Sequence, residues 1–174
     1  MSGWPRDRPG MHNDGAMSQG SVDPAVVGRL SVFAGLGEAS LRRVAALAVI
    51  EEHAAGSILF RESDPSADVL FALEGRVSLS MRLGDARHVT VLSLGPGELV
   101  GWSAMFEGSR RVASARVTEA ASLLRLPGRA LRDLCEADHD VGYAVMRQLA
   151  AVLAQRLHDT RLQLMDMFGK EQGA

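Results

Sequence analysis

Glycine residues divide the middle of this chain into short segments of similar length. After Ile50 they recur at positions 56, 75, 84, 95, 97, 101 and 108. The segment from Val77 to Met81 alternates, with apolar residues on one face and serines on the other. Further strands are predicted over 88–94, 111–117 and 121–126, with a hairpin turn over Leu83–Asp85. Strands this short and evenly spaced predict a mainly β fold, a β-roll or jelly roll of about eight strands.

Helices are predicted on both sides of this β region. Asp23 is a suitable N-cap before Pro24, and Ser40 opens a second helix. A short helix fits 128–136, and a long one fits 141–168. Along the long helix, residues of one face recur at steps of three and four: Met146, Leu149, Leu153, Leu157, Thr160, Leu164 and Met167. Such a seam predicts packing against a second copy of the helix in a homodimer.

The length of 174 residues suits a single domain with tails. Residues 1–23, rich in Gly, Pro, Ser and Asp, are predicted to be a disordered tail. The domain is expected over 24–168, followed by a short tail over 169–174. A formal net charge of −2 argues against direct binding to DNA or an anionic membrane. No membrane span or signal peptide is evident, so we expect a cytoplasmic protein.

Residues that would support catalysis or metal binding do not form recognisable sets. Cys135 is the only cysteine, and it is expected to be a structural residue on a helix. The histidines do not form a spaced ligand pair, so no metal site is predicted. His88 either faces solvent or, on a strand facing the interior, serves as an axial haem ligand. No nucleophile, base and orienting group occur in a known motif, and we therefore expect no enzyme.

Two segments resemble the cyclic-nucleotide-binding domain of bacterial catabolite activator and anaerobic regulator proteins, kinase regulatory subunits and ion channels. The first runs from Gly56 through Gly75 to Leu79. The second, Leu94–Gly101 followed by Arg111–Ala113, is similar to the phosphate-binding cassette of that family. The resemblance covers about 25–168 and implies a regulatory domain whose ligand is cyclic AMP or cyclic GMP. It implies ligand contacts at Gly101, Trp102, Ser103, Ala104, Arg111, Val112, Ala113 and Thr160.

The cassette has a physical logic of its own. A glycine before a short helix, expected here over 102–106, lets the backbone approach an anion. Strand alternation places Arg111 inward with Ala113, Ala115 and Val117, whereas Arg110, Ser114 and Arg116 face outward. A buried arginine requires a negative partner. That partner is either a ligand phosphate or an internal carboxylate such as Glu98 or Glu107.

The chain departs from the family pattern at two positions. Trp102 stands where the family has a glutamate that binds the ribose hydroxyl, and Val112 stands where it has Ser or Thr. Trp102 either stacks on a flat ligand or fills the pocket, and Ser103 offers a substitute hydroxyl. Thr160 lies near the position of a polar contact to the base in the family, or it is a threonine tolerated in a dimer interface.

Two functions follow. The first is a non-enzymatic sensor that binds a cyclic nucleotide or another small anion and signals through its C-terminal helix. The second is a degenerate domain that binds no small molecule and serves as a dimerisation or protein-docking scaffold. The family's DNA-binding members carry a helix-turn-helix after the long helix, and none is expected here.

Overall fold

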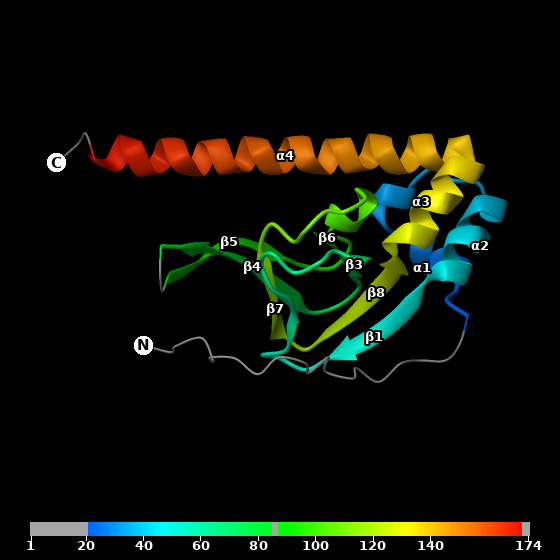
Figure 1. Ribbon diagram of the computed structural model, residues 1–174, viewed down its shortest axis with the longest axis horizontal. Helices are drawn as coiled ribbons and strands as arrows, with labels where there is room; N and C mark the ends of the chain where they lie inside the picture. Colours follow the sequence, from blue (N-terminus) through cyan, green and yellow to red (C-terminus); the bar gives the residue numbers. More distant parts are fainter. Residues whose placement is uncertain (1–20, 85–86, 172–174) are drawn as a thin grey trace.

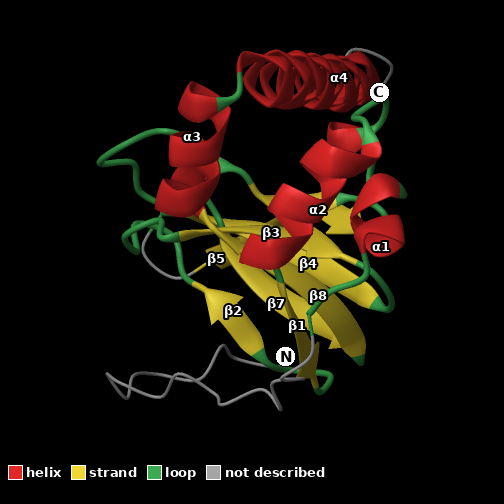
Figure 2. Cartoon of the chain, turned by 90° about the vertical axis from the view of Figure 1, so that its right-hand side faces the viewer, coloured by secondary structure: helices red, strands yellow, loops and turns green. Residues whose placement is uncertain are grey.

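The computed structural model describes residues 21–84 and 87–171. Eight strands form two four-stranded antiparallel sheets, ordered β1-β8-β3-β6 and β2-β7-β4-β5, with helices against the first (Figures 1 and 2). The strands are β1 (Val49–His53), β2 (Ile58–Phe60), β3 (Asp68–Ala72), β4 (Arg76–Leu83), β5 (Arg87–Leu94), β6 (Leu99–Gly101), β7 (Ser114–Glu119) and β8 (Ala121–Pro127). The α-helices are α1 (Pro24–Gly28), α2 (Glu38–Leu47), α3 (Gly128–Ala137) and α4 (His139–Glu171), and the 3₁₀ helices are η1 (Ser31–Phe33) and η2 (Ser103–Met105). The predicted mainly β roll is confirmed.

The first sheet is buried on both faces, and this creates two cores. Along β3, Val69 and Phe71 point to the helices, while Leu70 and Ala72 point into the roll. Phe71 packs on Phe33 of η1, with ring centroids 5.5 Å apart. The helix-side core and the roll interior are therefore separated by one layer of backbone.

The predicted helix starts are correct for α1 and wrong for α2. The Asp23 carboxylate accepts a hydrogen bond from the Ala25 N–H at 2.8 Å, as an N-cap does. The second helix begins at Glu38, after Gly37, so Ser40 lies inside it. The Ser40 hydroxyl instead faces Asp138, at the junction of α3 and α4, at 3.5 Å. Most of the predicted N-terminal tail lies outside the described residues, although Val22 is buried in the helix-side core.

The β4–β5 hairpin extends beyond the body of the roll (Figure 1). Val77 and Leu79 are buried as predicted, but Met81 is exposed and Ser80 is buried. The pairing with β5 shifts by one residue between Leu79 and Ser80, which disrupts the expected alternation. Gly84 has a φ of 64° at the predicted turn, and Asp85 lies outside the described residues.

Among the described side chains of helix α4, the buried apolar ones lie in its first half. Val141, Val145 and Leu149 are buried in the helix-side core. The prediction that Leu149 belongs to the dimer seam is therefore wrong, because this side of the helix faces the sheet. Among the described side chains of α4, the exposed large apolar residues are Tyr143 and two members of the predicted seam, Met146 and Leu157. The side chains of Leu164 and Met167 lie outside the described residues. Within the described chain, no helix is both long and apolar enough to cross a membrane.

Candidate functional site

Arg111 is only 6% exposed and lies just before β7. The loop over residues 61–66 holds its backbone. The Ser63 N–H donates to the Arg111 carbonyl at 2.8 Å, and the Arg111 N–H donates to the Asp64 carbonyl at 2.9 Å. Ser63 has a φ of 70°, a conformation uncommon for residues other than glycine, within this turn. The loop thus anchors the backbone from which the arginine side chain enters the roll.

The inward face is buried as predicted, with two corrections. The strand predicted over 111–117 begins only at Ser114, so Arg111 lies in the segment before it. Arg111, Ala113, Ala115 and Val117 are all buried. Ser114 is also buried, although strand alternation placed it outward. Its hydroxyl accepts a hydrogen bond from the Glu62 N–H at 2.9 Å, so the 61–66 loop covers the outer face there.

The guanidinium of Arg111 has few partners for a buried cation. Nη2 donates to the Asp68 carbonyl at 2.7 Å, and Cζ lies 4.2 Å from the centroid of the Phe60 ring. Nε and Nη1 are buried without a hydrogen-bond partner among the described residues. Burial lowers the pKa of Arg111, and the charges of Asp68 and Asp64 oppose that shift. Because an arginine remains protonated even so, the site presents a positive charge with unused donors.

An ion pair of Arg111 with Glu98 or Glu107, the alternative that the sequence left open, is not found among the described residues. Glu98 accepts a hydrogen bond from the Gly95 N–H at 2.7 Å instead, and Glu107 is exposed. Neither Glu98 nor Glu107 is therefore the negative partner of Arg111.

Gly101 lies directly against this guanidinium. A Cβ at position 101 would lie 2.5 Å from Nη1 of Arg111 and 3.4 Å from Cε1 of Phe60. A β-bulge causes this orientation: Gly101 pairs with Leu70 and Leu99 pairs with Phe71, leaving Val100 as the extra residue. Leu70 faces the roll interior, and the bulge turns Gly101 the same way. A side chain at position 101 would displace the Arg111 guanidinium, so glycine permits the close approach seen here.

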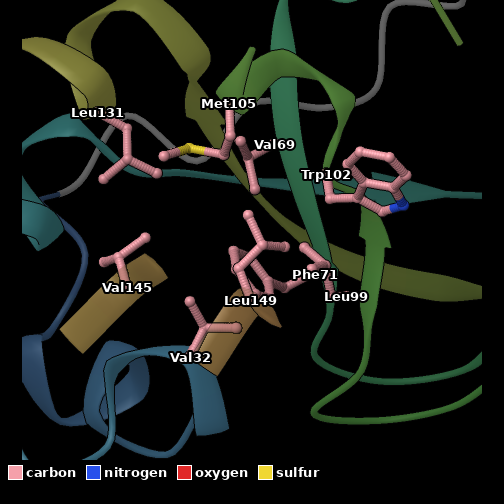
Figure 3. A pocket seen from close by; sticks show the side chains of 9 residues that line it. All are labelled: Val32, Val69, Phe71, Leu99, Trp102, Met105, Leu131, Val145 and Leu149. Carbon is pink, nitrogen blue, oxygen red and sulfur yellow. The ribbon is translucent and has the colours of Figure 1, made fainter. Parts of the chain in front are cut away.

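Trp102 turns to the opposite side of the sheet. Its half-buried indole packs on the helix-side core and makes an edge contact with Phe106, with centroids 5.8 Å apart. It lines an apolar pocket beneath α4, together with residues from η1, β3, β6, η2 and α3 (Figure 3). The pocket is lined by Val32, Val69, Phe71, Leu99, Trp102, Met105, Leu131, Val145 and Leu149. The indole therefore lies under α4 and not beside Arg111 in the roll interior.

The other predicted ligand contacts occupy varied environments. Ser103 begins η2, and its hydroxyl lies 3.1 Å from that of Ser66. Ala104 is buried against Gly128, and a Cβ added to Gly128 would lie 2.6 Å from the Cβ of Ala104. Val112 is 55% exposed, and Ala113 is buried in the roll interior. Thr160 is exposed on α4 and donates to the Arg156 carbonyl at 2.8 Å. The structure thus brings Gly101 and Arg111 into contact, whereas Thr160 lies on the helix outside.

Sequence reasoning missed three residues around Arg111: Phe60, Asp64 and Asp68. Asp68 also contacts Arg125, whose Nη1 lies 3.4 Å from its carboxylate, while Arg125 Nε donates to Glu51 at 2.6 Å. Burial alone would lower the pKa of Arg125, but Glu51 and Asp68 raise it above its ordinary value. A charged residue inside the leucine-rich strand 123–126 was the available signal for this network.

Metal and thiol chemistry find no support among the described residues. No group of three potential ligand residues lies close enough together to hold a metal ion in this part of the chain. His88 is exposed on β5, so it does not point into the roll. Cys135 is half-buried, and burial raises the pKa of its thiol to about 11, which makes it a poor nucleophile at neutral pH.

Comparison with known proteins bears on the family and the fold of this chain. Residues 50–138 match the family described as "Cyclic nucleotide-binding domain". A protein described as a cyclic nucleotide-binding protein, from Geobacter metallireducens, has a similar structure, with a TM-score of 0.70 and 27% identity. The match covers 79% of this chain and 99% of that one.

Two curated relatives are longer proteins. Glutaminase 2 of Bradyrhizobium diazoefficiens is 28% identical over 131 residues, which is 75% of this chain and 20% of the enzyme. The CRP-like cAMP-activated global transcriptional regulator of Mycobacterium tuberculosis is 24% identical over 142 residues, 82% of this chain and 62% of the regulator. This chain therefore spans about a fifth and about three fifths of these relatives. With the family match covering half of its length, the chain belongs to the cyclic nucleotide-binding domain family.

Proposed function

We propose that this domain is a non-enzymatic sensor that binds a small anion at Arg111 and signals through α4. Cyclic AMP and cyclic GMP are the first candidates, because the chain belongs to a family described by that ligand class. The observation that carries the proposal is the state of Arg111, a buried cation whose Nε and Nη1 have no hydrogen-bond partner in the described part of the chain. An unpaired buried charge is costly, and a ligand phosphate supplies both the charge and the acceptors that are missing.

The ligand contacts expected from the cassette divide into two groups. Arg111 and Gly101 face each other in the roll interior, so the phosphate belongs there. Trp102 cannot replace the family's glutamate as a hydroxyl acceptor, since an indole only donates. Ser103, Ala104, Val112, Ala113 and Thr160 remain predicted contacts. We therefore expect weaker recognition of the ribose than of the phosphate.

A route from the site to α4 is provided by the residues on either side of Gly101. The carbonyl of Leu99 accepts a hydrogen bond from Nη2 of Arg156 on α4. Trp102 lines the apolar pocket with Val145 and Leu149 of the same helix. A ligand that shifts the backbone at Gly101 would therefore change two contacts with α4. We propose that binding alters the population of α4 positions in this way.

Calorimetric titration tests the proposal with cyclic AMP, cyclic GMP and cyclic di-GMP on the full chain. We expect saturable binding of one of them, weakened at least about 30-fold by Arg111→Ala, since hydrogen bonds to a charged group contribute about 1.5–3 kcal/mol each. Arg110→Ala is the matched control, because the neighbouring Arg110 is exposed and donates to the Ser63 carbonyl. Absence of heat with all three nucleotides would contradict nucleotide sensing.

The second candidate is a dimerisation or docking scaffold that binds no small molecule. The exposed apolar residues of α4 favour it, with Tyr143 70% exposed and Leu157 55% exposed. We propose that this face pairs with a second copy in a homodimer or receives a protein partner. In either role we place the protein in the cytoplasm and expect no direct binding to DNA or membrane. Sedimentation with and without nucleotide distinguishes a constitutive dimer from a ligand-dependent one.

A further inference from the structure

Phe60 is the residue whose ring lies against the Arg111 guanidinium, with Cζ over the ring and 4.2 Å from its centroid. Its position depends on a second β-bulge. In the pairing of β2 with β7, Ile58 lies opposite Arg116 and Phe60 lies opposite Ala115, so Leu59 is an extra residue. Regular alternation would put Phe60 on the same face as Ile58. The bulge instead turns it inward, the side on which Ala115 is fully buried.

Two bulges on different sheets thus converge on one side chain. The bulge in β6 aims Gly101 at Nη1, and the bulge in β2 aims Phe60 at Cζ. Phe60 Cε1 also lies 3.4 Å from the space that a Cβ on Gly101 would fill. The ring is therefore in position to contact both the arginine and the glycine of the cassette.

The way in which Arg111 is held leaves its charge intact. The contact with the ring brings no counter-charge, and Nε and Nη1 have no hydrogen-bond partner among the described residues. The carbonyl of Asp68 occupies Nη2, and neither the ring nor the carbonyl carries a formal charge. Two carboxylates, those of Asp64 and Asp68, are close enough for their charges to act on Arg111. The Asp64 carboxylate already accepts a hydrogen bond from the Arg61 N–H at 2.8 Å, and the Asp68 carboxylate forms an ion pair with Arg125.

A long flexible arginine close to two carboxylates would ordinarily form an ion pair with one of them. We propose that Phe60 is a positioning residue that holds the Arg111 guanidinium away from Asp64 and Asp68, so that the anion site stays charged and open to a ligand. The inference rests on the proposed function, because it assumes that Arg111 binds an anion. It adds a residue that determines affinity without touching the ligand.

The test uses inorganic phosphate as the probe and the Arg111 Nε–H signal in ¹⁵N NMR spectra of the full chain as the readout. We expect Phe60→Leu to weaken phosphate binding about fivefold or more, since it removes the ring face. Phe60→Tyr keeps the ring and should bind within about twofold of wild type. Phe106→Leu is the matched control, because that exposed ring contacts Trp102 and not Arg111.

A rescue variant separates positioning from a merely structural role. Adding Asp64→Asn to Phe60→Leu removes a competing charge while keeping an acceptor for the Arg61 N–H, so phosphate binding should return toward wild type. If Phe60→Leu does not fold, Phe60→Met provides a second ring-free variant of similar volume. Phosphate binding by a folded ring-free variant within about twofold of wild type would overturn the role of Phe60. A wild-type Arg111 signal that phosphate does not move would overturn the anion site itself.

Discussion

Arg111 and Arg125 lie near each other on the inner side of the same roll and share a partner, yet their environments are opposite. Arg125 donates to Glu51 and faces the Asp68 carboxylate, and these contacts raise its pKa. Within the described residues, the Arg111 side chain donates a hydrogen bond only to the carbonyl of Asp68, and burial lowers its pKa. One arginine has its charge compensated within the fold, whereas the other keeps unused donors. Burial alone therefore does not distinguish a ligand-binding arginine from a structural one. The absence of a counter-charge beside the buried guanidinium makes that distinction.

The largest expected effect on stability comes from replacing Arg125, the arginine whose charge is compensated within the fold. Arg125→Met leaves Glu51 and Asp68 partly buried without their cation. We expect the free energy of unfolding to fall by about 2 kcal/mol, less than for a fully buried pair because these side chains retain some solvent contact. Urea unfolding followed by circular dichroism measures it. An unchanged midpoint would mean that the network contributes nothing to stability.

A smaller and two-sided effect is expected from Asp68→Asn, which acts on both arginines. The backbone carbonyl that accepts from Arg111 remains, but the charge facing Arg125 is lost. Stability should fall by about 1 kcal/mol or less. Anion binding at Arg111 should tighten, because a nearby negative charge has been removed. Urea denaturation and anion titration of the same variant measure the two effects. A loss of stability accompanied by weaker anion binding would contradict the different roles assigned to Arg111 and Arg125.

The smallest stability effect is expected at Arg111 itself. Arg111→Met removes a buried cation that has no ion-pair partner among the described residues, but it also removes the hydrogen bond to the Asp68 carbonyl and the contact with the Phe60 ring. Because these effects oppose each other, the free energy of unfolding should change by less than about 0.5 kcal/mol. Parallel unfolding of Arg125→Met provides the reference. A loss as large as that of Arg125→Met would show that Arg111 is structural and would favour the scaffold function.

Much of the fold could be predicted because its signals are local. Asp23 caps its helix through a residue two positions away, and the glycine spacing marks the turns of the roll. The burial of Arg111 together with Ala113, Ala115 and Val117 was also predicted, although Arg111 precedes β7 and the 61–66 loop holds its backbone. Prediction failed where a distant segment covers a residue. The 61–66 loop buries Ser114, and Leu149 packs against the first sheet in the helix-side core.

The sequence by itself therefore determined the β-roll, its flanking helices, its family and the arginine at its centre, since periodicity, caps and glycine spacing depend on residues near one another in the chain. Only the tertiary structure decided what surrounds that arginine. The bulges at Leu59 and Val100 arise from the pairing of each strand with its neighbour. Asp68 contacts Arg111 through its backbone carbonyl and Arg125 through its carboxylate, and these arginines lie 43 and 57 positions away in the chain. Whether a buried charge is compensated depends on side chains brought together by folding, and strand alternation along one segment does not contain that information.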